Sequence, residues 1–212
     1  EANPKVDVLA FWYLYDFDIY KQPTVVHKKS MVCRNDGCVS WSGKLHEDFA
    51  ENRQINVQFV EGIERLHLTT DERVVEAQKR NVEVSRGDVE SSPNDPRSYW
   101  NLANSYLGAN DFANAKETFE LFIDKSASHE EKYLAQMRLG VVIDSLGDKK
   151  GGIKALQTAI GMRPDYPDAY LHIGELCFKY DMLELAEFYL LNGLMKKPPY
   201  HSIMVYNPRD YD

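Results

Sequence analysis

The side chains best suited to catalysis, metal binding or phosphate binding lie in one short segment, residues 33–48. This segment holds a guanidinium at Arg34, an indole at Trp41 and the run His46-Glu47-Asp48. Guanidinium groups bind phosphates and carboxylates, imidazoles ligate metal ions, and carboxylates coordinate hard cations or accept protons. A second imidazole, His67, follows further along the chain. Catalysis or metal binding is expected here before anywhere else in the sequence.

Each of these residues also has a structural interpretation. A lone histidine at a strand end is more often a hydrogen-bonded structural residue than a ligand, and this applies to both imidazoles. Trp41 is an ordinary core residue by type. Glu47 and Asp48 could cap the next element, and Arg34 could pair with an acidic neighbour. The residue types alone therefore leave both interpretations open.

Composition excludes several classes of protein. The chain has 212 residues, of which 43% are apolar and 27% charged, which is typical of a globular protein and excludes wholesale disorder. Its net charge of -8 argues against a general nucleic-acid binder, which needs a basic face. No apolar run approaches the roughly 18 residues of a transmembrane helix. The three cysteines have no framework or zinc spacing, which predicts a reducing, cytoplasmic location.

The amino-terminal third favours β-strands, because residues 4–68 are rich in Val, Tyr, Phe, Trp and Thr. The expected strands lie at residues 6–15, 23–27, 30–34 and 55–60. Asn35-Asp36-Gly37 predicts a turn, since glycine tolerates positive φ.

From residue 71 the apolar spacing becomes helical. Thr69 or Thr70 is a suitable N-cap for this helix, with acidic residues in its first turn. The segment 91–96, Ser-Ser-Pro-Asn-Asp-Pro, breaks the helix and is the strongest domain boundary in the sequence.

The rest of the chain repeats one pattern three times, beginning at Tyr99, Gln136 and Tyr170. Each copy has apolar residues at offsets +3, +7 and +20, most of them large, and a turn residue at +11. The small residues at +4 and +16 let the two helices of a hairpin approach closely, and a later proline ends the second helix in two copies. The turn positions are Asn110, Gly147 and Asp181. This order resembles the tetratricopeptide (TPR) repeat, which implies six helices in three stacked hairpins.

The sequence therefore predicts a helix-dominated α+β fold, in which a short mixed or antiparallel strand region precedes a TPR α-α superhelix. The expected domains are a strand-rich region at 1–70, a linking helix and boundary at 71–95, three repeats at 96–198 and a polar tail at 199–212.

TPR arrays often bind a peptide with side chains of the first helix of each hairpin. The inward candidates here are Asn101, Asn104 and Arg138, whereas the third hairpin offers His172 and Glu175 and no basic residue. A dedicated peptide groove and a rigid spacer or self-association element both remain open on this pattern.

Residues 33–48 also carry a resemblance to a known family. Arg34, a turn, and then Trp41-x-Gly43-x-x-His46-Glu47 resemble the carboxyl-terminal half of the catalytic domain in family 2 glycosyltransferases. His67, Arg80-Asn81 and Asp95-Pro96-Arg97 continue the similarity, which spans roughly residues 8–125 and runs into the repeats as in several members of that family.

This resemblance implies an inverting transfer from a sugar nucleotide to a hydroxyl of a glycan or surface polymer, assisted by Mn²⁺ or Mg²⁺. His46 and His67 would contact the metal or the diphosphate, and Glu47 or Asp48 would act as the base. Trp41 would form a platform for a ring, and Arg34 would contact phosphate.

The donor-binding half of that family, about 100 residues, is missing before this region. The resemblance therefore predicts a fragment of a longer enzyme that is inactive alone, with the repeats as a spacer or interaction module. The alternative is a non-catalytic TPR interaction scaffold, in which residues 1–90 form an α+β cap on the end of the array.

Overall fold

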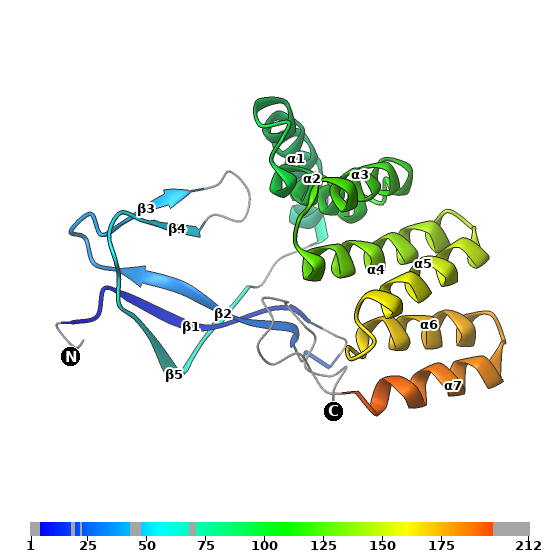
Figure 1. Cartoon of the computed structure of the whole chain (residues 1–212). Helices are drawn as coiled ribbons and strands as arrows, with labels where there is room; N and C mark the ends of the chain where they lie inside the picture. Colours follow the sequence, from blue (N-terminus) through cyan, green and yellow to red (C-terminus); the bar gives the residue numbers. More distant parts are fainter. Residues whose placement is uncertain (1–4, 18–19, 22, 43–47, 68–70, 197–212) are drawn as a thin grey trace. The chain divides into compact units, whose positions relative to one another are not determined.

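The chain divides into two compact units, one before and one from Asp71 onward, and each is described by itself. The computed structural model describes residues 5–17, 20–21, 23–42, 48–67 and 71–196. Figure 1 shows strands in the first unit and helices in the second. None of the helices in these ranges combines the length and apolar character that spanning a bilayer requires.

The first unit contains two small sheets. The three-stranded sheet has the order β2-β1-β5, with β1 antiparallel to β2 and parallel to β5. The second sheet is an antiparallel pair of β3 and β4. The strands are β1 (Val8–Phe17), β2 (Pro23–Cys33), β3 (Val39–Ser42), β4 (Asp48–Glu51) and β5 (Val57–Leu66). β3 and β4 were not among the expected strands, because four-residue strands carry little periodic signal.

The prediction of two separate strands at 23–27 and 30–34 is wrong, since β2 is continuous. The polar pair Lys28 and Lys29 does not interrupt it, because both side chains lie over aromatic rings. The Lys28 ammonium is 4.4 Å from the ring centroid of Phe59, and the Lys29 ammonium is 5.4 Å from that of Tyr13. A lysine stem can therefore cover the sheet while its charge stays near water.

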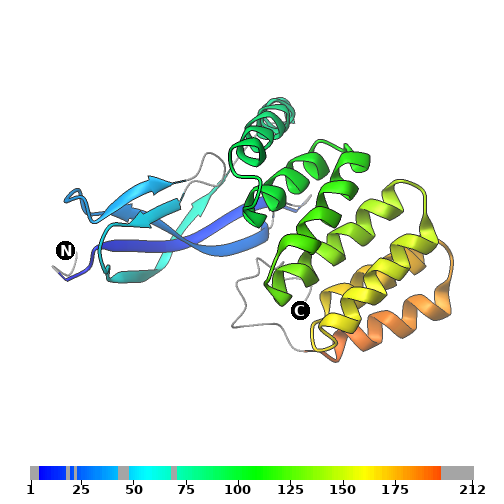
Figure 2. The same ribbon diagram turned by 45° about the horizontal axis from the view of Figure 1, so that its top comes forward.

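The helices of the second unit form three consecutive hairpins, α2/α3, α4/α5 and α6/α7, as the repeat pattern predicts. Figures 1 and 2 show the hairpins side by side in chain order. The helices are α1 (Asp71–Ser91), α2 (Pro96–Gly108), α3 (Phe112–Lys125), α4 (His129–Ser145), α5 (Lys149–Met162), α6 (Asp168–Lys179) and α7 (Leu183–Leu194). The helix-rich α+β fold class is thus confirmed.

The helix α1 packs on α2 instead of linking two domains. Ser85 and Ser105 share a hydrogen bond of 3.0 Å between their hydroxyls, and the Arg86 guanidinium donates to the Tyr106 hydroxyl at 2.7 Å. The units separate before Asp71, so the segment 91–96 is a turn between packed helices and not the domain boundary expected from its composition. Helix-breaking residues mark a turn whether or not the next helix returns to the same core.

The predicted turn positions adopt the backbone that such turns need. Asn110, Gly147 and Asp181 have φ of 57°, 91° and 58°, in the left-handed region. The aspartates that follow the first two, Asp111 and Asp148, accept backbone hydrogen bonds that cap α3 and α5. The turn residues thereby end one helix and the caps start the next.

Small residues set the distance between paired helices. A Cβ added to Gly152 in α5 would lie 2.9 Å from the carbonyl oxygen of Gly140 in α4. That distance is shorter than real Cβ contacts allow, and the obstructing atom belongs to the backbone of the neighbouring helix. The α4/α5 pair can therefore exist at this spacing only with glycine at position 152.

We expect Gly152→Ala to lower the free energy of unfolding by about 1–2 kcal/mol, because overpacking costs more than the improved helix propensity returns. The matched control is Gly161→Ala in the same helix, where an added Cβ meets nothing within 4 Å. This control should raise stability by about 0.5 kcal/mol. Urea unfolding followed by circular dichroism measures both, and equal shifts in the two variants would contradict close helix approach at Gly152.

Candidate functional site

The first helices of the three hairpins, α2, α4 and α6, carry the residues with binding capacity in the second unit. We call their shared surface the A-helix face and define it by Trp100, Asn101, Asn104, Arg138, His172 and Glu175. Most of these side chains are half-buried, unlike the core residues that pack each helix against its partner.

Trp100 and Arg138 form the centre of this face. The guanidinium carbon of Arg138 lies 4.8 Å from the ring centroid of Trp100, so α2 and α4 meet in a cation–π contact. The indole also packs on the core, with the Phe122 ring centroid 5.2 Å away. The core therefore holds the Trp100 ring in place, and the ring in turn holds the Arg138 guanidinium.

Asn104 lies one helical turn after Trp100. Its amide nitrogen donates to the Trp100 carbonyl oxygen at 2.7 Å, which fixes the side chain. Its amide oxygen is buried and, among the described residues, is the one buried side-chain oxygen or nitrogen without a hydrogen-bond partner. Because this oxygen is buried, a ligand on the surface does not reach it in this conformation.

The third hairpin presents a different charge. His172 and Glu175 approach within 3.3 Å on α6, and this hydrogen bond lowers the pKa of the Glu175 carboxyl from its ordinary value. The A-helix face thus has a guanidinium between α2 and α4 and a carboxylate on α6. Such a face can bind and orient a polar chain, and the groups have no arrangement typical of nucleophilic catalysis.

In the first unit, Arg34 and Trp41 make contacts that stabilise the two sheets. The Arg34 guanidinium donates to the Val6 carbonyl oxygen at 2.7 Å, so the side chain spans the ends of β1 and β2. Trp41 is 66% exposed and packs against Phe49 across the β3/β4 pair, with ring centroids 4.6 Å apart. The core location expected for Trp41 is wrong, because most of its side chain is exposed.

His67 lies at the far end of β1 from Arg34. Its Nδ1 shares a hydrogen bond with the Tyr13 hydroxyl, and its backbone N–H donates to the Leu14 carbonyl oxygen at 2.9 Å. The Arg34 backbone N–H instead donates to Asp7. At about 3.3 Å per strand residue, the two backbones are roughly 20 Å apart along β1. The structure does not bring these two candidates together.

The remaining candidates of this segment stay predictions. His46 and Glu47 lie outside the described residues, and so does the side chain of Asp48, whose backbone pairs with Ser42 at the start of β4. A metal shared by His46 and His67, and the Mn²⁺ or Mg²⁺ that the resemblance implies, therefore remain sequence-based expectations.

A group of possible ligands that sequence reasoning missed involves Asp7, Asp36 and Cys38. Within the described ranges these are the residues whose ligand atoms converge, all within 4.8 Å of one another. Arg53 already supplies a positive charge there, with ion pairs of 2.8 Å to Asp7 and 3.3 Å to Asp36. The group is therefore an ion-pair network that ties the turn after β2 to the start of β1. Only its turn residue Asp36 had a sequence signal.

The hydrogen bond from Arg53 holds the pKa of the Asp7 carboxyl at about 2, below its ordinary value of 3.8. Because the folded-state pKa is depressed, this pair stabilises the first unit above about pH 4, and the contribution disappears as the pH falls toward 2. Arg53→Gln should raise the Asp7 pKa toward 3.8 in a carboxyl ¹³C NMR titration. The control Arg65→Gln, on β5, should leave it unchanged, and an unchanged pKa in Arg53→Gln would refute the pairing.

Comparisons with known proteins concern the repeats. A family model described as tetratricopeptide repeat matches residues 96–124. The solved structure "Crystal structure of MamA" is 21% identical with a TM-score of 0.50, covering 61% of this chain and 77% of that chain. "MamA MSR-1 C2" is 19% identical with a TM-score of 0.48, covering 55% of this chain and 66% of that chain. The match thus spans just under two thirds of that relative's length.

A third structure, YrrB, described as "a TPR protein with an unusual peptide-binding site", is 18% identical with a TM-score of 0.46, covering 59% of this chain and 63% of that chain. No curated protein matches the chain in sequence. None of these matches names a glycosyltransferase. The second unit therefore contains a TPR repeat at residues 96–124 and shares its fold with TPR proteins.

Proposed function

We propose that the chain is a non-catalytic protein-interaction scaffold whose A-helix face binds an extended partner segment with a carboxylate near Arg138. The observation that carries this proposal is the contact between Arg138 and Trp100, which presents a guanidinium on an aromatic ring fixed by the core. The TPR repeat at residues 96–124 supports it, because this architecture supplies such faces for protein partners.

The chemistry of the face favours a carboxylate at one end of the ligand. A guanidinium binds a carboxylate with two parallel hydrogen bonds. The Asn104 side chain, one turn further along α2, is fixed beside Trp100 by its hydrogen bond to the carbonyl oxygen of that residue. Glu175 on α6 disfavours a second carboxylate there, so we expect the bound segment to have a defined direction.

The transferase hypothesis concerns the first unit and rests on its sequence resemblance alone. Inverting transfer, a sugar-nucleotide donor and a glycan acceptor would each need groups that converge on one substrate. Arg34, Trp41 and His67 instead contact neighbours within their own sheets. We therefore place the function of this chain in its helices.

The test selects peptides from a random display library on the wild-type chain and then measures their affinity for variants. We expect the selected peptides to carry Asp, Glu or a free carboxyl terminus. Arg138→Glu should weaken them about 10- to 100-fold, because a charge-assisted hydrogen bond contributes roughly 1.5–3 kcal/mol. Fluorescence anisotropy of labelled peptides gives the dissociation constants.

The matched control is Lys154→Glu, which makes the same charge reversal at an exposed position of α5 outside the A-helix face. Binding to this variant should equal that of the wild type. Peptides that lose affinity equally for both variants would respond to net charge only. Peptides that bind Arg138→Glu as tightly as the wild type would place their site elsewhere.

A further inference from the structure

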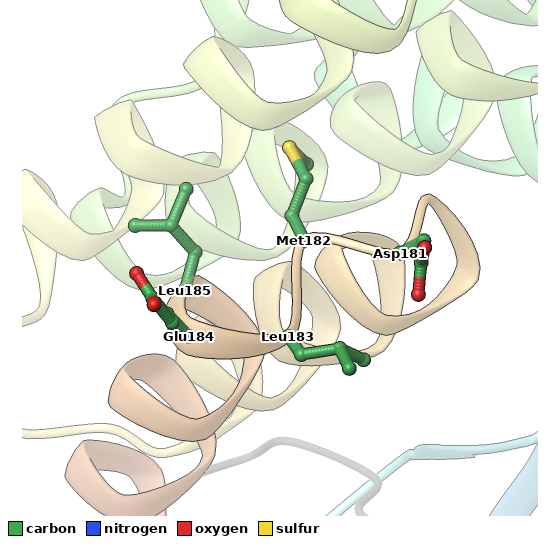
Figure 3. Close-up of a pocket in the computed structure, with 5 residues that line it drawn as sticks. All are labelled: Asp181, Met182, Leu183, Glu184 and Leu185. Carbon is green, nitrogen blue, oxygen red and sulfur yellow. The ribbon is translucent and has the colours of Figure 1, made fainter.

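A hollow of about 380 Å³ lies beside the first turn of α7, where residues 181–185 line it. Figure 3 shows that these side chains do not converge, because Met182 points toward the neighbouring helices and Leu183 points away from them. All of them come from one continuous segment, so they could contact a small molecule from one side only. The hollow is therefore no binding site by itself, and ligand recognition in the second unit stays with the A-helix face.

The chain leaves the helical array beside this face. Lys196 follows the end of α7, and its ammonium lies 5.0 Å from the ring centroid of Tyr170 in the first turn of α6. Glu175 lies just over one turn further along α6, which is about 8 Å along the helix axis. The segment that follows Lys196 therefore starts close to the acidic part of the A-helix face.

Two contacts hold α4 and α6 side by side. At one end the Tyr133 hydroxyl accepts a backbone N–H of α6 at 3.3 Å, and at the other the Lys179 ammonium pairs with the buried Asp144 carboxylate at 2.7 Å. Arg138 and Glu175 lie between these contacts. Because packed helices are about 8–10 Å apart, the guanidinium and the carboxylate of the A-helix face are separated by roughly 10–15 Å.

The sequence that follows Lys196 is suited to an extended conformation. Residues 197–212 lie outside the described ranges, and prolines occupy positions 198, 199 and 208. Proline disfavours a helix both at its own position and at the residue before it. We therefore expect an extended approach to the charged run Arg209-Asp210-Tyr211-Asp212.

We propose that this 197–212 segment binds back to the A-helix face of its own chain and competes there with the partner. The inference rests on the function proposed above, because it regulates the same surface. Charge order supports it: a segment that comes from α7 meets Glu175 first and Arg138 second, and it carries Arg209 first and Asp212 second. Extended chain places Arg209 and Asp212 about 10 Å apart, and their side chains add the remaining reach.

The length of the segment permits this contact. Residues 197–208 span at most about 40 Å when fully extended, which exceeds the distance from Lys196 to either charged group of the face. A short flexible connection gives an effective concentration in the millimolar range, so even a weak contact forms in a large share of the molecules. A partner then binds only the remaining share, and its apparent dissociation constant rises about 2- to 10-fold.

The first experiment places a photo-crosslinker in the intact chain. Tyr211→benzoylphenylalanine lies between the two aspartates, and we expect its cross-links on α2 and α4 near Arg138. Mass spectrometry of a mixture of ¹⁴N- and ¹⁵N-labelled chains shows whether each cross-link lies within one chain. Cross-links mainly on other elements, cross-links between chains, or no cross-links would each overturn the proposal.

A charge exchange tests the pairing. Arg138→Glu should lower the yield of these cross-links about 3- to 10-fold, because attraction between exposed charges becomes repulsion. Adding Asp210→Lys and Asp212→Lys to the same chain should restore the yield. The matched control is Lys154→Glu, at an exposed position of α5, and it should change nothing. A yield that does not depend on the charge at position 138 would refute the contact.

The competition is measured with the carboxylate peptides selected on the wild-type chain. The variant with Asp210→Asn and Asp212→Asn should bind them about 2- to 10-fold more tightly, because the face is then open in more molecules. The matched control neutralises two exposed carboxylates of α3, through Glu117→Gln and Asp124→Asn, and should bind like the wild type. Equal affinities in the wild type and the Asp210/Asp212 variant would refute regulation by the segment.

The two readouts separate this inference from the function on which it rests. Peptides that bind neither the wild type nor the Asp210/Asp212 variant, together with the expected cross-links, would refute an external partner and leave the internal contact standing. Peptides that bind as expected without any cross-link near Arg138 would refute the internal contact and leave the binding face standing.

Discussion

The close approach of paired helices at their small residues is the constraint on which the second unit depends. At Gly140 and Gly152 the backbones of α4 and α5 come so near that a single added Cβ would strike a carbonyl oxygen. The buried Ala103 and Ala115 occupy the equivalent positions of the first hairpin. Because this spacing is set within each hairpin, the large residues at the other repeat positions, such as Phe119 and Leu156, can be buried between the helices.

That packing determines what remains for binding. The side of each helix that faces its partner is used by the core, so only the outward positions can differ in chemistry from one repeat to the next. On the first helices these positions hold the Trp100–Arg138 contact at one end and the His172–Glu175 pair at the other. On the last helix they hold apolar side chains in place of charges. A regular scaffold thus displays two different surfaces, one polar and directional, the other apolar.

In the first unit, arginine and histidine side chains of the kind found in binding sites stabilise the sheets. The buried core of this unit is small, with Val6, Val8, Ala10, Leu14 and Cys38 as its buried apolar residues in the described ranges. Polar contacts therefore hold its strand ends, through Arg34 on the Val6 carbonyl and Arg53 on Asp7. Guanidinium and imidazole groups that a substrate could have used bind backbone and side-chain atoms of the sheets instead. A site needs residues that can bind or react, but it exists only where the fold brings those residues together.

Local periodicity was enough to determine the repeats from the sequence: the three hairpins, the small positions, and the turns at Asn110, Gly147 and Asp181. Each depends on residues fewer than about 40 apart and on one backbone geometry used three times. Only the tertiary structure decided that α1 joins the helices, that Arg53 meets Asp7, and that Arg138 lies over Trp100. The first two of these contacts join elements whose separation in sequence follows no period, and the third depends on which side chains two successive repeats carry at neighbouring positions. Their partners are selected by packing and charge once the chain has folded, and no local pattern records that selection.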